Sequence, residues 1–121
     1  MDFTAPTGTE VYATADGTVE LVERSRRGYG NKVIIDHGFG YKTVYAHLDD
    51  FNNLWKGKEV KRGDVIAYVG STGLSTAPHL HYEVHLNGKK INPINYYFED
   101  LTAEEYDRMI LLSLRPGQSY D

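Results

Sequence analysis

Three histidines lie close together in the segment STAPHLHYEVHLNG, at His79, His81 and His85. Polar and apolar residues alternate strictly along HLHYEVHL, which predicts a β-strand. Successive side chains of a strand point to opposite faces, so the three histidines share one face with Glu83, and the apolar residues share the other. Imidazole binds metal ions and exchanges protons near neutral pH. This polar face is therefore a candidate metal or catalytic site.

The spacing of His79 and His81 favours two different roles for them. Two strand residues on the same face have Cα atoms about 6.6 Å apart, which makes it hard for both imidazoles to bind one ion in the same way. One ring can bind a metal ion while the other lies beside the reacting water. An ordinary solvated strand face is the alternative, but two histidines directly after the STAPH turn favour a site. For His85, further along the strand, we predict a surface role.

Two other histidines are weaker candidates. His47 ends the segment YKTVYAHL, where a strand would place it on one face with Tyr41, Thr43 and Tyr45. A single histidine at a strand end is not by itself evidence of a site. His37 lies in the turn segment DHGFG, and we expect its ring to make local hydrogen bonds there.

Composition limits the possible ligands and partners. The chain has 121 residues, a formal charge of −4 and no cysteine, so any metal must be bound by His, Asp or Glu. One short basic segment, ERSRRGYG, is interpreted as a solvated hairpin end, and the acidic balance argues against nucleic acid as a partner. The longest apolar run, MILLSL, is far below the roughly 20 residues of a transmembrane helix. MDFTAPTG lacks the features of a signal peptide.

The remaining segments predict an all-β fold. Short β-rich runs recur every eight to twelve residues or so, separated by turn signals at Asp16-Gly17, HGFG and Asn87-Gly88. This spacing is typical of a mostly antiparallel sandwich or barrel-like sheet. We expect a hairpin at Asp16-Gly17, and a buried strand in DVIAYVG.

The end of the chain has a different pattern. Thr102 is followed three residues later by Glu105, which forms a capping box, and the apolar residues of EEYDRMILLSL recur at helical spacing. We therefore predict one domain: a β-sheet domain over residues 1–98, and a C-terminal α-helix and tail over 99–121 that pack on the outside of the same domain.

Four segments in order resemble the lysostaphin-type (LytM-type) zinc metallopeptidases: DFTAPTGTEVYATADGTV, GYGNKVIIDHGFGYKTVYAHL, VKRGDVIAYVGSTGLSTAPHLHYEV and NGKKINP. The resemblance runs from Asp2 to about Pro93. His-x-His alone would be a weak signal, but the ordered set is specific. The resemblance implies the small, mostly antiparallel lysostaphin-type fold (a duplicated hybrid motif) with a groove.

The resemblance also implies a site. Zinc would be bound by Asp2, from an H-x-x-x-D motif, and by His81, the second histidine of H-x-H. His79 and His47 would form the catalytic pair that positions the attacking water, acts as general base and stabilises the tetrahedral intermediate. Zinc lowers the pKa of bound water to about 7 and polarises the scissile carbonyl. The family cleaves peptide bonds in bacterial peptidoglycan, so the implied substrate is a peptide cross-link and the implied location is the periplasm or cell envelope.

The chain departs from the family pattern at its start. In the family motif a zinc-binding histidine precedes the aspartate by four residues, which is three residues before Met1. We expect the parent protein to carry that histidine, preceded by an export signal. A catalytic zinc site has three protein ligands and an open fourth position. With Asp2 and His81 alone, zinc affinity and activity should fall.

Two other interpretations stay open. Non-catalytic relatives that lose zinc ligands act as cell-wall binding modules or amidase activators, although such a module has little physical need for Asp2, His47, His79 and His81 together. The segment GDVIAYVGSTG also resembles small β-sheet carrier domains, namely lipoyl carriers and the glucose-specific phosphotransferase carrier. A lipoyl carrier needs a lysine at a hairpin tip, for which the lysines of NGKKINP are poor candidates. The phosphocarrier has no use for AHL together with PHLHYEV and Asp2.

Overall fold

The computed structural model describes residues 2–75 and 77–91. Within these ranges the chain forms nine β-strands and no helix. The strands are β1 (Asp2–Thr4), β2 (Glu10–Tyr12), β3 (Gly17–Glu23), β4 (Asn31–Gly38), β5 (Tyr41–Phe51), β6 (Glu59–Val60), β7 (Val65–Val69), β8 (His79–Leu86) and β9 (Lys89–Ile91). The prediction of a mostly antiparallel all-β fold is confirmed. The expected helix and tail at 99–121, and the boundary after residue 98, lie outside the described residues.

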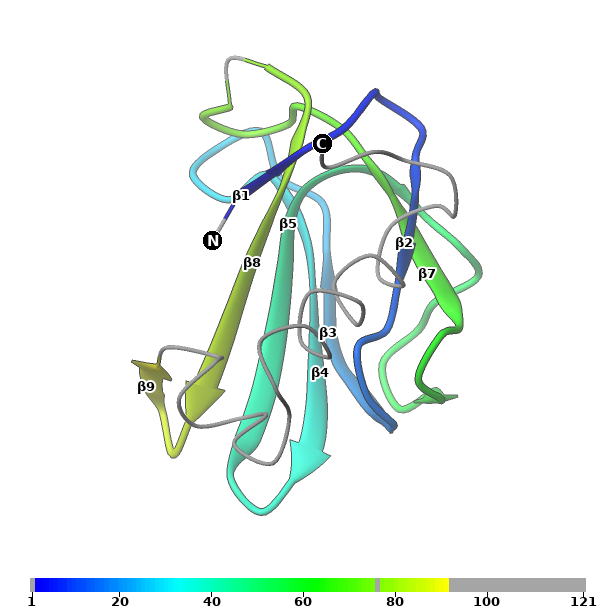
Figure 1. The fold of residues 1–121 in the computed structure, drawn as a ribbon, viewed down its shortest axis with the longest axis vertical. Helices are drawn as coiled ribbons and strands as arrows, with labels where there is room; N and C mark the ends of the chain where they lie inside the picture. The colour runs from blue at the N-terminus through cyan, green and yellow to red at the C-terminus, as the bar shows by residue number, and fades with distance from the viewer. Residues whose placement is uncertain (1, 76, 92–121) are drawn as a thin grey trace.

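The strand order places the histidine strand between two neighbours. The strands follow the order β1-β8-β5-β4-β3-β6, with β9 paired to β8, and β7 paired to both β2 and β5. Figure 1 shows β8, β5 and β4 side by side, with β2 and β7 grouped apart from them. On one edge of β8, β1 pairs with its first residues and β9 with its last. The start of β8 is therefore held between β1 and β5.

The apolar face of β8 lies in the core, as its alternation predicts. Leu80, Tyr82 and Val84 are almost completely buried. They pack in one cluster with buried residues from the other strands, among them Val11, Val19, Val33, Ile35, Leu48 and Val69. Burial of this face turns His79 and His81 toward the opposite side of the strand.

Two of the three predicted turns connect paired strands. Asn87 and Gly88 join β8 to β9, and both have positive φ angles, 51° and 84°, which suit an Asn-Gly hairpin turn. The HGFG segment joins β4 to β5, with Gly38, Phe39 and Gly40 all at positive φ. DVIAYVG forms β7, with Ile66, Ala67 and Val69 buried. These expectations are confirmed.

The hairpin expected at Asp16-Gly17 is wrong. The strand before it, β2, pairs with β7, and the strand after it, β3, pairs with β4 and β6. The physical reason lies in Thr14, which is buried and whose backbone N–H donates to Tyr45 Oη at 3.1 Å. The segment between β2 and β3 is therefore fixed in the core and does not form a tight hairpin turn, and the two strands join different strand pairs. The Asp-Gly dipeptide signals a change of direction but does not specify the partner strand.

His37 lies near the end of β4, and both of its ring nitrogens have hydrogen-bond partners. Nδ1 donates to the backbone oxygen of Asp16 at 2.6 Å, and Nε2 lies 2.7 Å from Thr43 Oγ1. Gly17 permits this approach, because a Cβ there would lie 2.9 Å from His37 Nδ1 and 2.6 Å from the backbone oxygen of Asp36. The ring makes hydrogen bonds as expected, but one of them reaches a segment distant in sequence. This arrangement gives His37 a structural role.

The pKa of His37 predicts a loss of stability in acid. Burial lowers the pKa of the His37 imidazole below its usual value, although the hydrogen bond to Asp16 and the charges of Asp36 and Asp16 oppose the shift. Unfolded chains then bind a proton at His37 at a higher pH than folded chains do, so stability falls as the pH drops through about 6.5. Urea midpoints at about pH 8 and about pH 5 should differ more for the wild-type chain than for His37→Phe. An equal pH dependence in both chains would contradict this role.

Candidate metal and catalytic site

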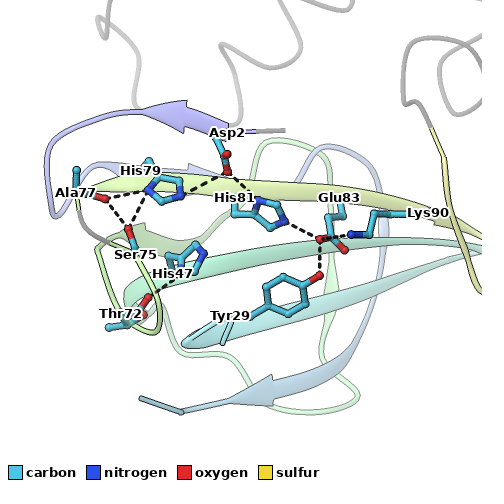
Figure 2. Close-up of polar contacts among 10 residues, drawn as sticks. All are labelled: Asp2, Tyr29, His47, Thr72, Ser75, Ala77, His79, His81, Glu83 and Lys90. Atoms are coloured by element: carbon cyan, nitrogen blue, oxygen red, sulfur yellow. Dashed lines mark hydrogen bonds and ion pairs between the residues drawn. The ribbon is translucent and has the colours of Figure 1, made fainter. Parts of the chain in front are cut away.

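The pairing of β1 with β8 brings Asp2 to the histidines. Asp2 is directly opposite His81 in the ladder, and Thr4 is opposite His79. Directly opposite residues project their side chains to the same face of a sheet. Asp2 Oδ1 accordingly lies 2.8 Å from His81 Nδ1 and 3.5 Å from His79 Nε2 (Figure 2). Residues separated by almost the whole described chain therefore share one cluster.

His47 reaches the same cluster because β5 bends at that residue. Before His47, β5 pairs with β8, and after it, β5 pairs with β7. His47 itself has a φ of 60°, in the left-handed region that few non-glycine residues adopt. Its ring centroid lies 4.9 Å from that of His79 and 5.9 Å from that of His81. The structure thus brings together all four residues that the resemblance singles out.

Backbone oxygens determine which nitrogen of His47 and of His79 carries the proton. His47 Nδ1 lies 2.6 Å from the oxygen of Thr72, and His79 Nδ1 lies 2.9 Å from the oxygen of Ala77. A carbonyl oxygen only accepts hydrogen bonds, so both Nδ1 atoms donate. In the neutral rings both Nε2 atoms then carry a lone pair, and that of His79 faces Asp2 (Figure 2). Ser75 Oγ, 3.0 Å from His79 Nδ1 and 2.6 Å from the oxygen of Ala77, supports this arrangement.

His81 lies between two carboxylates. Its Nδ1 is 2.8 Å from Asp2 Oδ1, and its Nε2 is 2.6 Å from Glu83 Oε2. A neutral imidazole has one N–H, so it can donate to only one of the two acceptors. If Nε2–H donates to Glu83, the lone pair of Nδ1 faces a carboxylate oxygen, and a cation between them removes the repulsion. This donor set of imidazole nitrogen and carboxylate oxygen fits zinc.

Asp2, within the cluster of Asp2, His47, His79 and His81, and the neighbouring Glu83 are both ionised. Burial raises the pKa of Asp2, but the hydrogen bond from His81 and the charges of His81 and His79 outweigh it, so the pKa lies below its usual value. Burial likewise raises the pKa of Glu83, but hydrogen bonds from Tyr29, His85, His81 and Lys90 lower it to about 2. Both carboxylates are therefore negative at neutral pH.

The cluster offers two candidate metal ligands, Asp2 and His81. Among the described residues, no three His, Asp or Glu side chains are arranged to hold one metal ion together. His85 does not join the cluster, because its Nε2 donates to Glu83 Oε1 at 2.8 Å. His37 lies apart from the cluster, at the far end of β4. For His85 we expected a surface role, and in the structure its ring contacts the buried carboxylate of Glu83.

Sequence patterns alone assigned no role to Glu83, Tyr29 or Thr72. A role for Glu83 could have been predicted, because the alternation in HLHYEVHL places this charged residue on the same face as His81 and His85. Tyr29 and Thr72 come from loops, and their contacts with the histidines depend on the fold. The Tyr29 ring stacks on that of His81, with centroids 5.5 Å apart, and the backbone oxygen of Thr72 contacts His47 Nδ1. No local signal marks these contacts.

Comparison with known proteins is consistent with this cluster. A sequence model described as Peptidase family M23 matches residues 1–93. The chain is 50% identical over 95 residues to the DD-carboxypeptidase/endopeptidase Mpg of Neisseria meningitidis, covering 78% of this chain and 21% of that protein. It is 42% identical over 96 residues to the murein hydrolase activator NlpD of Escherichia coli, covering 79% and 25%. The chain thus spans about a fifth to a quarter of the curated relatives that it matches.

Among solved structures, the chain resembles a zinc-containing peptidase from Vibrio cholerae. The two superpose with a TM-score of 0.70 and are 44% identical, over 74% of this chain and 27% of that chain. At 44% identity the two proteins are related in sequence as well as in fold.

Proposed function

The chain belongs to peptidase family M23, and on that premise we propose that it is a zinc-dependent endopeptidase domain that hydrolyses peptide cross-links of bacterial peptidoglycan. The observation that carries the proposal is the convergence of His47, His79 and His81 on the carboxylate of Asp2. It agrees with the resemblance to the lysostaphin-type metallopeptidases, a resemblance that the family match confirms.

In this proposal Asp2 and His81 hold the metal. Zinc, when bound, makes water more acidic and polarises a carbonyl group. His81 would bind through Nδ1 and Asp2 through Oδ1, two atoms that lie 2.8 Å apart. One similar solved structure is described as a zinc-containing peptidase. A catalytic zinc site commonly has three protein ligands, and the resemblance implies that the third would be the histidine of the H-x-x-x-D motif.

His47 and His79 do the proton chemistry in this proposal. Each ring has a bare Nε2 that can take a proton from water, and each Nδ1–H donates to a backbone oxygen that stabilises the resulting imidazolium. One ring acts as the general base, and the other, once protonated, stabilises the negative oxygen of the tetrahedral intermediate. Because the carbonyls hold both rings, the pair is oriented before the substrate arrives.

The substrate and location follow from the relatives. Mpg is named as a DD-carboxypeptidase/endopeptidase, and NlpD as a murein hydrolase activator. The name of NlpD refers to murein, which is peptidoglycan, so we place this protein in the periplasm or cell envelope. Within the described residues, no helix has the length and apolar character needed to cross a membrane.

An amidase-activating role is the second candidate. One observation favours it: the 42% identity to the murein hydrolase activator NlpD over 79% of this chain. The four converging residues favour hydrolysis, because an activator needs none of their proton chemistry.

One experiment tests both roles. In one set of reactions, purified peptidoglycan is incubated with the zinc-supplemented wild-type chain or with its His79→Ala variant. In a second set, peptidoglycan is incubated with a cell-wall amidase alone, with the amidase and the wild-type chain, or with the amidase and the variant. Mass spectrometry of the soluble products should show cleaved cross-links with the wild-type chain alone, and none with the variant. Stimulation of the amidase by both chains, with no cleavage by either, would instead establish the activator role.

A further inference from the structure

Glu83 is a buried charge next to the proposed metal ligand. It lies on β8 between His81 and His85, and only 4% of its surface is exposed. Buried carboxylates are rare unless several groups compensate them, because removing a charge from water is unfavourable. A buried glutamate at this position therefore needs a structural or functional reason.

Four side chains surround the two oxygens of Glu83. Oε2 accepts from Tyr29 Oη at 2.6 Å, and it lies 2.6 Å from His81 Nε2 and 3.3 Å from Lys90 Nζ (Figure 2). Oε1 accepts from His85 Nε2 at 2.8 Å. One oxygen therefore faces the metal cluster, and the other faces away from it.

We propose that Glu83 is a positioning residue for His81: it keeps the proton on Nε2, so that Nδ1 stays bare and aimed at the metal position beside Asp2. The proposal rests on the metal role of His81 proposed above. Histidine ligands commonly donate their second nitrogen to a carboxylate, which fixes both the protonated nitrogen and the ring orientation. Without Glu83 the only charged acceptor of His81 is Asp2, so the proton would move to Nδ1, the nitrogen that must bind the metal.

Tyr29 supports this arrangement through three contacts. Its ring stacks on that of His81 with an interplanar angle of 21°, and its hydroxyl donates to Glu83. Its backbone oxygen accepts from the backbone N–H of His47 at 2.8 Å. Tyr29 therefore contacts the ring plane of His81, the carboxylate that orients it, and the backbone of the proposed catalytic His47.

The protonated nitrogen of His81 can be measured without any metal. We would record nitrogen NMR spectra of the metal-free chain, at a pH where the ring is neutral, for the wild type and for Glu83→Gln. Glutamine keeps the volume of Glu83 and removes its charge. We expect the proton on Nε2 in the wild type and mainly on Nδ1 in the variant. A proton that stays on Nε2 in a folded Glu83→Gln chain would overturn the proposal.

Zinc affinity supplies the second readout, by competition with a chromogenic chelator. Glu83→Gln should weaken zinc binding by about 10- to 100-fold, and Tyr29→Phe, which keeps the stacked ring, by a smaller factor. The matched control is His85→Phe, which removes a donor from Oε1 without touching His81, and it should bind zinc as the wild type does. An equal loss in His85→Phe and Glu83→Gln would mean that Glu83 serves only general stability, and would overturn the proposal.

The two readouts separate this inference from the proposed function. If no chain binds zinc but the proton moves as expected, the positioning role stands, and the metal proposal is then decided on a chain extended by the histidine of the family motif. If Glu83→Gln does not fold, as judged by circular dichroism, Tyr29→Phe takes its place in the NMR experiment, where a partial move of the proton toward Nδ1 is expected. A Tyr29→Phe spectrum identical to that of the wild type would then overturn the proposal that Glu83, supported by Tyr29, positions His81.

Discussion

Replacing His81 with alanine should remove bound zinc from the chain. His81 supplies one of the two candidate ligands in the described cluster, and the other, Asp2, has 61% of its side chain exposed and would hold a metal ion poorly by itself. Elemental analysis of the purified chain in zinc-containing buffer is the measurement. Zinc that is near-stoichiometric in the wild type and absent from His81→Ala would show that Asp2 and His81 assemble a site.

The control for this prediction is His85→Ala. His85 lies on the same strand and face, but its Nε2 contacts Glu83 Oε1 and not the cluster. It should therefore retain the zinc of the wild-type chain. Equal zinc in the wild type and in His81→Ala would contradict the ligand role, since the metal would then be bound elsewhere.

An extended chain makes the same prediction sharper. The family motif places a histidine four residues before Asp2, and three protein ligands are usual in catalytic zinc sites. A chain with an added N-terminal segment that carries this histidine should bind zinc more tightly than a matched chain with alanine there. If neither this chain nor His81→Ala holds zinc, this pair of extended chains decides whether a third ligand before Asp2 is required for binding.

The sequence predicted most of what positions the site. Alternation in HLHYEVHL correctly placed Leu80, Tyr82 and Val84 in the core and the histidines on the other face, because a strand of period two leaves no other choice. The Asn87-Gly88 hairpin was equally predictable, since its turn chemistry and its strand pairing are both local.

What sequence patterns did not predict depends on contacts between distant segments. The failed hairpin at Asp16-Gly17 reflects the buried contact of Thr14 with Tyr45. Similarly, the stacking of Tyr29 on His81 joins two segments that no periodicity relates. A local pattern specifies the direction of a side chain within its own strand, but tertiary packing determines which groups it meets.

The position of His47 is the clearest case. Its alternation with Tyr41, Thr43 and Tyr45 would continue a straight strand, yet β5 bends there and changes its partner from β8 to β7. The bend requires a φ of 60° at His47, and the ring is aimed at the cluster because of it. A non-glycine residue in this conformation is unfavourable by about 1–3 kcal/mol, and such residues concentrate at functional sites.

Replacing His47 with asparagine should separate catalysis from stability. Asparagine adopts positive φ more readily than most residues, and its amide can donate to the oxygen of Thr72, as His47 Nδ1 does at 2.6 Å. We expect a urea midpoint equal to or above that of the wild type. Because asparagine has no basic nitrogen in place of Nε2, hydrolysis should fall by about 100- to 10,000-fold.

The matched variant is His47→Val, which removes the same nitrogen but is β-branched and poorly suited to positive φ. It should be as inactive as His47→Asn and less stable by about 1–3 kcal/mol. Urea titration and hydrolysis of cross-linked peptidoglycan, measured on all three chains, give the two readouts. Equal midpoints for the two variants would show that the bend at residue 47 carries no strain. Full activity in His47→Asn would mean that the imidazole of His47 takes no part in the chemistry. Loss of activity with retained stability in His47→Asn would show that the imidazole serves the chemistry and that the bent backbone does not depend on it.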